Sequence, residues 1–172
     1  MIKKGQVWVE TVIYTLIGIG LMALVLSFLL PKINQSQDKA VVEQSIETLN
    51  SIEQKMQESM GGAAGSARII PFLRLKKGSL IIDGKDDTLR FIIEGLKTEY
   101  SQPDVEIPYG RMTIRTEKIS KNYKVTMEIK PGYDILYRGQ NILQIIPPSP
   151  TPYKLSISNA NGKANFEEIS GR

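Results

Sequence analysis

The sequence predicts an α+β fold, in which a long N-terminal transmembrane and stem α-helix is followed by a small antiparallel β-sheet domain. Three observations predict this fold. An apolar run lies close to the N-terminus, apolar residues then recur at helical spacing up to residue 60, and short segments of alternating apolar and polar residues fill the chain from residue 67 onward. A period near 3.6 residues indicates a helix, and a period of 2 indicates a strand.

The apolar run over residues 7–30 is long enough to cross a membrane. At about 1.5 Å per residue it extends roughly 36 Å as a helix, and a hydrocarbon core is about 30 Å thick. Cleaved secretory signals have a shorter apolar region and a small-residue cleavage site, whereas this run ends at Leu30-Pro31-Lys32. We therefore expect the helix to remain attached. Lys3 and Lys4 precede the run, which predicts a cytoplasmic N-terminus and an extracytoplasmic remainder.

One carboxylate, that of Glu10, lies inside this apolar run. An ionised carboxylate at membrane depth costs about 2.5 to 3.5 kcal/mol on insertion scales, so it needs a partner or becomes protonated. An alternative is that Glu10, close to the helix start, reaches the membrane interface and interacts with the positive end of the helix dipole. The residue is therefore the first functional candidate.

The sequence Lys3-Lys4-Gly5-Gln6, followed by Glu10 and an apolar helix, resembles the class III signal peptide of archaeal type IV pilin-like proteins. The resemblance implies that a prepilin-type peptidase cleaves between Gly5 and Gln6 and leaves the helix on the mature chain. Glu10 would then be the fifth mature residue, where pilins carry a glutamate that helps to align incoming subunits. An assembly ATPase, a polytopic membrane platform and self-association into a filament are also implied.

Small residues recur at helical spacing within the apolar run. One set has the spacing i, i+3, i+7 and the other has i, i+4, i+7, and both spacings favour close approach of helices in lipid. The two sets are Gly20, Ala23 and Ser27, and Thr11, Thr15 and Gly18. They predict helix packing in a filament core.

After Pro31 the pattern becomes amphipathic, which predicts that the helix continues as a stem. The stem is expected to end at Gly61 and Gly62, where a flexible glycine-rich linker begins. The apolar stripe is expected to pack under the outer domain or against neighbouring stems. Its members are Val42, Ile46, Leu49, Ile52, Met56 and Met60.

Strands are predicted wherever apolar and polar residues alternate between turn sequences. The expected strands cover residues 67–75, 79–83, 88–93, 111–119, 123–129, 133–137, 141–146, 153–158 and 164–169. Turns are expected at residues 84–87 and 121–122, and at Asn161-Gly162. The predicted organisation is a leader (1–5), a transmembrane helix (6–30), a helical stem (31–60), a linker (61–66) and an extracytoplasmic β domain (67–172). This last domain is expected to fold alone unless the stem completes its core.

Composition excludes several classes of protein. The chain has no Cys and no His, which excludes disulfide frameworks, thiol nucleophiles, histidine-based triads and nearly all zinc sites. Once Lys3 and Lys4 leave with the leader, 20 Lys and Arg face 18 Asp and Glu, so a dedicated nucleic-acid surface is not expected. We expect no cofactor and no catalytic residues.

For four further motifs we favour an ordinary structural interpretation over a functional one. Asp83, Asp86 and Asp87 lack the ligand spacing of a calcium loop and are expected to form a solvated turn. The proline run over residues 147–152 is expected to be an exposed loop and not a polyproline ligand. Asn34 begins a glycosylation sequon, which a filament would bury. The pair Glu167-Glu168 points to opposite faces of a strand.

These observations predict a structural, non-enzymatic pilin-like subunit with a single membrane span, which moves from the membrane into a surface filament. The alternative is a membrane-anchored extracytoplasmic binding module that does not polymerise. An anchored hydrolase is a third interpretation, and it would require an acidic cleft that the sequence does not reveal.

Overall fold

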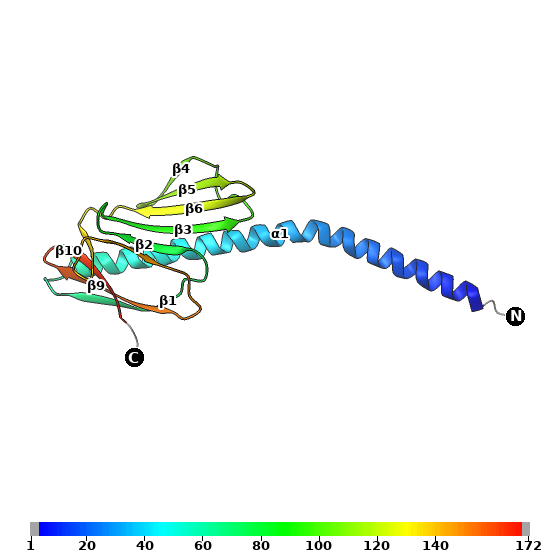
Figure 1. The fold of residues 1–172 in the computed structure, drawn as a ribbon, viewed down its shortest axis with the longest axis horizontal. Coiled ribbons are helices and arrows are strands. Elements are labelled where there is room, and N and C mark those ends of the chain that lie inside the picture. The colour runs from blue at the N-terminus through cyan, green and yellow to red at the C-terminus, as the bar shows by residue number, and fades with distance from the viewer. Residues whose placement is uncertain (1–3, 170–172) are drawn as a thin grey trace. The chain divides into compact units, whose positions relative to one another are not determined.

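The computed structural model describes the backbone of residues 4–169 and the side chains of residues 8–169. It confirms the α+β prediction: one helix, α1 (Lys4–Met60), precedes all the strands and continues through Pro31 (Figure 1). The strands are β1 (Ala67–Leu73), β2 (Ser79–Asp83), β3 (Thr88–Leu96), β4 (Glu106–Tyr109), β5 (Met112–Ile119), β6 (Asn122–Ile129), β7 (Ile135–Tyr137), β8 (Leu143–Ile146), β9 (Tyr153–Ala160) and β10 (Lys163–Glu168).

The strands form two sheets. The smaller has the order β1-β9-β10-β7 and the larger has the order β4-β5-β6-β3-β2-β8. Every pair of strands is antiparallel except β7 with β10, where Ala164 lies opposite Ile135. A parallel pair needs a long crossover between its strands, and the chain provides one here because it passes through β8 and β9 before β10 begins.

The chain divides into two compact units, residues 1–37 and residues 38–172. The second unit begins inside the predicted stem, so residues 38–60 of α1 belong with the sheets. One face of this part of the helix is fully buried, and its apolar members are Val42, Ile46, Leu49, Ile52 and Met56. They join a single apolar cluster with residues of both sheets.

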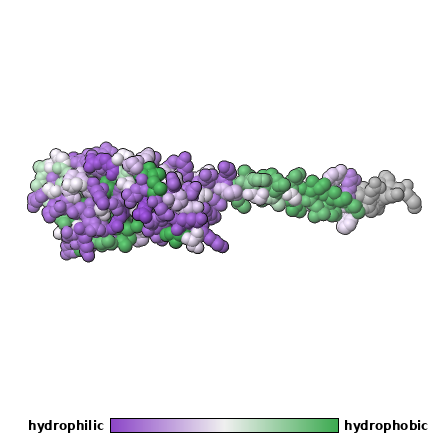
Figure 2. Space-filling view, turned by 90° about the horizontal axis from the view of Figure 1, so that it is seen from above, coloured by the Kyte–Doolittle hydropathy of each residue, from purple (hydrophilic) through white to green (hydrophobic). Residues whose placement is uncertain are grey.

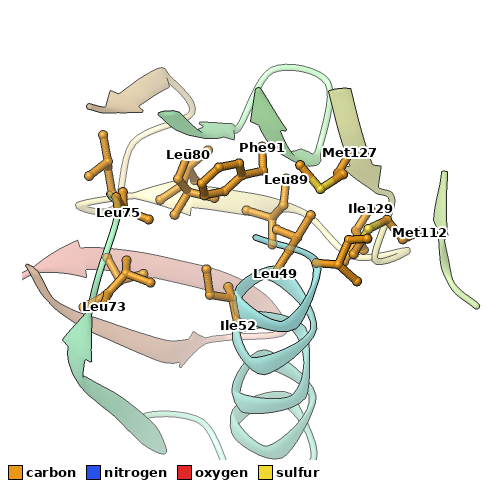
Figure 3. Close-up of a cluster of buried hydrophobic side chains, with 14 of the residues drawn as sticks. Leu49, Ile52, Leu73, Leu75, Leu80, Leu89, Phe91, Met112, Met127 and Ile129 are labelled. Atoms are coloured by element: carbon orange, nitrogen blue, oxygen red, sulfur yellow. The ribbon is translucent and has the colours of Figure 1, made fainter. Parts of the chain in front are cut away.

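The core of the second unit lies where α1 meets the inner faces of the sheets. Figure 3 shows Leu49 directed towards Leu89 and Ile129 of the larger sheet, while Ile52 lies on the side of Leu73 from β1. Phe91 is the largest of the labelled side chains and is also buried. Burial of an aliphatic or aromatic side chain contributes about 1.5 to 3 kcal/mol, so the helical face is a major part of the stability of this unit.

Hydrogen bonds connect the turn that follows α1, which is the expected glycine-rich linker, to the rest of the unit. Ser59 Oγ donates to the carbonyl oxygen of Ser66 at 2.9 Å, and Ser66 Oγ donates to that of Ser59 at 2.6 Å. Asn159 Nδ2 donates to the carbonyl oxygen of Gly62 at 3.1 Å, and the Gly65 N–H donates to that of Asn159 at 2.8 Å. Composition predicts flexibility here, and these contacts connect the segment to β9.

A carboxylate ties the other end of the buried helical face to the loop after β3. Asp38 Oδ2 accepts hydrogen bonds from the backbone N–H of Lys97 at 2.6 Å and of Thr98 at 3.0 Å, and from Thr98 Oγ1 at 3.2 Å. Its side chain is only 12% exposed. Hydrogen bonds to a charged acceptor are stronger than those between neutral groups, so Asp38 anchors the helix where it enters the unit.

A second acidic side chain, Glu53, is buried on the same helix. Its Oε1 lies 2.9 Å from Arg111 Nε and accepts a hydrogen bond of 2.9 Å from Gln57 Nε2. Arg111 comes just before β5, so this ion pair joins the helix to the larger sheet. The amphipathic pattern did not predict burial of Glu53.

The predicted strands are confirmed to within a few residues, with two differences. The structure adds β4, all four residues of which are exposed, so it has no alternating pattern to detect. The β5–β6 turn consists of Ser120 and Lys121, one residue earlier than expected, because Ile119 pairs with Asn122. Phe72 lies at a register shift in β1 and is 74% exposed, outside the core. Asn161 and Gly162, with φ of 54° and 88°, form the predicted tight turn.

The buried helical face predicts how fragments of the chain behave. A fragment of residues 32–172 should fold into a cooperative β-rich monomer, whereas residues 62–172 should be unfolded or aggregated because the sheets lose five buried side chains. Within the longer fragment, Leu49→Ala should lower the free energy of unfolding by about 2 to 5 kcal/mol. Circular dichroism, sedimentation and urea denaturation measure these effects. The exposed neighbour Asn50 provides the control, since Asn50→Ala should change stability by less than about 0.5 kcal/mol. A folded 62–172 fragment would contradict this account.

The anchor at Asp38 gives a second prediction. In the fragment of residues 32–172, Asp38→Ala removes the acceptor of three hydrogen bonds and should lower the free energy of unfolding by about 1 to 3 kcal/mol in urea denaturation. Glu94→Ala, which removes an exposed carboxylate with no ion pair among the described residues, should leave the midpoint nearly unchanged. Equal midpoints for the two variants would show that Asp38 is not an anchor.

Candidate functional site

The first unit contains an apolar segment, residues 8–33 of α1, whose side chains are exposed along its whole length. Large aliphatic and aromatic residues occupy every face of it, and Figure 2 shows an apolar surface along most of the visible side, with hydrophilic residues towards its N-terminal end. Among the described residues, α1 is the one helix with the length and composition to cross a membrane. Exposing this much apolar surface to water is unfavourable, so the segment requires lipid or other apolar helices around it.

Glu10 lies in the first turns of the apolar segment and has one partner there. Tyr14 Oη donates a hydrogen bond to Glu10 Oε1 at 3.4 Å, which is long for a hydroxyl donor and therefore weak. No Lys or Arg of the described residues lies within ion-pair distance of Glu10. The carboxylate is thus only partly satisfied by its own helix. The sequence analysis missed Tyr14, although its i+4 spacing is a signal for such a pair.

The predicted cleavage site falls at the edge of what the structure describes. The backbone of Gly5 and Gln6 is helical, and their side chains lie outside the described set. Lys3 lies outside the described residues altogether. The processing site and the leader therefore stay predictions.

Small residues of the apolar segment leave space on two sides of the helix. A Cβ atom added to Gly18 or Gly20 would meet no atom within 4 Å, so nothing in the described chain packs there. At about 100° per residue, the set Gly20, Ala23 and Ser27 lies on roughly the opposite side of the helix from the set that contains Gly18. Ser27 Oγ donates to the carbonyl oxygen of Leu24 at 2.7 Å, so its hydroxyl is already satisfied.

Asn34 lies just beyond the apolar segment, within α1, and is half-buried. An acceptor asparagine for glycosylation is ordinarily on an exposed surface. That a filament would bury this sequon stays a prediction.

The carboxylates near the β2–β3 turn hold the turn together. Asp83 forms an ion pair with Arg90 and accepts hydrogen bonds from the backbone N–H of Lys85 at 3.0 Å and of Asp86 at 3.3 Å. Asp87 Oδ1 accepts a hydrogen bond of 2.8 Å from the backbone N–H of Ile135. Asp83 is thus buried and bonded within the fold, which corrects the expectation of a solvated turn, whereas Asp86 is exposed as expected. No group of three potential metal ligands is found among the described residues.

Known proteins provide no guide to this site. The chain matches no family model, no curated protein and no solved structure.

Proposed function

We propose that this protein is a pilin-like structural subunit of an archaeal type IV filament or a related surface assembly. The observation that carries the proposal is the exposed apolar segment, which continues as the same helix, α1, into the core of a folded β-sheet unit. A helix of this kind is compatible with a bilayer before assembly and with a bundle of apolar helices after it. The β-sheet unit would be displayed outside the cell.

The proposed maturation step is cleavage between Gly5 and Gln6 by a prepilin-type peptidase. The cut would leave a new amino group on Gln6, close to the start of the apolar segment. Single-pass insertion with the N-terminus in the cytoplasm would present this bond on the cytoplasmic side. An assembly ATPase and a membrane platform would then move the subunit into the filament.

The partly satisfied carboxylate of Glu10 supports a pairing role in assembly. In a low-dielectric bundle it would pair with the Gln6 amino group of a neighbouring subunit, because attraction between opposite charges is strongest where water is excluded. The two small-residue faces favour the same arrangement. A helix that packs on two opposite sides makes head-to-tail contacts that continue from subunit to subunit instead of closing as a dimer.

A second candidate is a membrane-anchored binding module that does not polymerise. The hydrogen bond from Tyr14 to Glu10 favours it, because a local donor stabilises the carboxyl group without a second subunit. Under this alternative Glu10 would be an interfacial residue near the positive end of the helix dipole.

The first test of the proposal is the N-terminus of the protein purified from its native membrane. Cleavage after Gly5 predicts a chain that begins with Gln6, which intact-mass measurement and N-terminal sequencing detect. The proposal fails if the isolated chain begins at Met1 or beyond Leu30.

The second test separates the two candidates through Glu10→Gln. This variant should insert and be processed normally, because the amide keeps the size of the side chain and is easier to bury in lipid. Assembly should nevertheless fail, since an unpaired buried amine costs about 3 to 5 kcal/mol per interface. An anchored module would lose only about 0.3 to 1 kcal/mol of dipole interaction. The measurement is the ratio of sheared filaments to membrane-retained subunit.

Tyr14→Phe is the matched control for this test. It removes the local hydrogen bond and keeps the carboxylate, so filaments should form as in the wild type. If Tyr14→Phe abolished filaments as completely as Glu10→Gln, the local bond and not intersubunit pairing would be the requirement. Normal filaments in Glu10→Gln cells would exclude the pairing mechanism.

A further inference from the structure

The hairpin of β5 and β6 ends in an apolar side chain between two cations. Lys118, Ile119, Ser120 and Lys121 are all exposed, and Ile119 has 51% of its surface exposed. The residues of β5 that face the core are Met112, Ile114 and Thr116, and Ile119 has the opposite phase on the strand, so it points away from the core. We call residues 118–121 the lysine tip.

The two lysines of the tip keep their positive charge. Neither forms an ion pair among the described residues. Their acidic neighbour Glu117 is already paired with Arg115 at 3.4 Å and with Lys124 at 3.2 Å. The tip is therefore cationic at its surface, with an aliphatic side chain between the charges.

The lysine tip lies at the end of the second unit that carries Asp38. Leu96 pairs with Tyr123, which in turn pairs with Lys118. The residue after Leu96, Lys97, donates its backbone N–H to Asp38 Oδ2 at 2.6 Å. Neighbouring strands are about 4.8 Å apart, so the tip lies roughly 10 Å to the side of Leu96.

The chain itself keeps this end of the unit close to a membrane. Ile33 is the last large residue of the exposed apolar segment, and Asp38 follows five residues later. Five residues extend about 8 Å as a helix and at most about 18 Å when fully extended. The headgroup layer adds roughly 5 to 8 Å outside the hydrocarbon core. A covalent distance thus holds the tip within reach of the headgroups, without a fixed arrangement of the two units.

From these observations we infer that the lysine tip binds anionic lipid headgroups of the membrane in which the chain is anchored. This inference rests on the membrane span, which both candidate functions share. The ammonium groups of Lys118 and Lys121 would lie among the phosphates, and Ile119 would enter the apolar boundary beneath them. Tyr123, half-buried behind the tip, has its ring centre 6.0 Å from Lys118 Nζ, and an amphipathic ring suits this interface.

A lipid surface matches both parts of the tip. Nucleic acid would pair with the lysines but would leave Ile119 unused. An apolar protein surface would cover Ile119 but would remove water from the lysines without replacing it. Either partner would also have to arrive by diffusion, whereas the span holds the bilayer beside the tip at a high effective concentration.

A polarity-sensitive fluorophore on the tip provides the test. The chain has no Cys, so Ser120→Cys creates a single attachment point in the full chain. Asn161→Cys is the matched control probe, because Ser120 and Asn161 are both exposed turn residues with positive φ, of 58° and 54°. The labelled chain is reconstituted in phosphatidylcholine vesicles with or without about one-third phosphatidylglycerol. The emission at residue 120 should shift to the blue in the anionic vesicles alone, and the emission at residue 161 should stay unchanged in both.

Variants of the labelled chain separate the contributions of charge and apolar contact. Lys118→Gln/Lys121→Gln should lower the ratio of bound to free tip about tenfold or more, and so should high salt. Ile119→Ser keeps both cations and should lower the ratio about fivefold. The charge-matched control is Lys85→Gln/Arg138→Gln, which removes two exposed cations outside the tip and should behave as the parent does.

Flotation of the vesicles distinguishes failure of the tip from failure of the anchor. If the chain does not float with the vesicles, the membrane span and the tip inference both fail. If the chain floats and the probe at residue 120 remains in water, only the tip inference fails. It is also overturned if neutral vesicles give the same shift, if the charge-matched control loses the shift as fully, or if the shift depends on the ratio of protein to lipid, which would indicate contact between subunits.

Discussion

The structure depends on the burial of one face of α1 between Val42 and Met56. Both sheets contribute to the cluster that surrounds this face, so neither encloses a complete core without the helix. Asp38 fixes the helix at the start of the buried part, and the turn from Ser59 to Ser66 fixes it at the end. The same continuous helix is exposed and apolar before residue 34. One secondary-structure element therefore serves two different surroundings, and its sequence changes from apolar on all sides to apolar on one face.

Much of this arrangement could be predicted because it is local. The period of the apolar residues predicted both parts of α1, and alternation with turn sequences predicted nine of the ten strands. β4 was not predicted, because it pairs only with β5 and buries none of its residues. The distant partners of Asp38 and Glu53 were also not predicted, since Thr98 and Arg111 lie in loops and no periodicity links such positions. The contact between the glycine-rich segment and Asn159 was not predicted for the same reason.

The candidate sites divide in a similar way. Glu10 was identifiable because a carboxylate in an apolar run is chemically conspicuous, and Tyr14 could have been found from its spacing. The contact between the proline run and the loop after β1 could not, because Ser149 and Leu75 meet only through the order of strands in the fold. The proline run by itself resembles any exposed loop.

The insertion of α1 into the core has a mechanical consequence. A pull on the apolar segment is transmitted to the buried face through one continuous backbone, because both belong to α1. To withdraw, the helix would have to slide the side chains of Val42, Ile46, Leu49, Ile52 and Met56 past the sheets at the same time. Shearing many contacts at once resists force far better than peeling them one by one. The attachment between helix and sheets is therefore expected to resist shear.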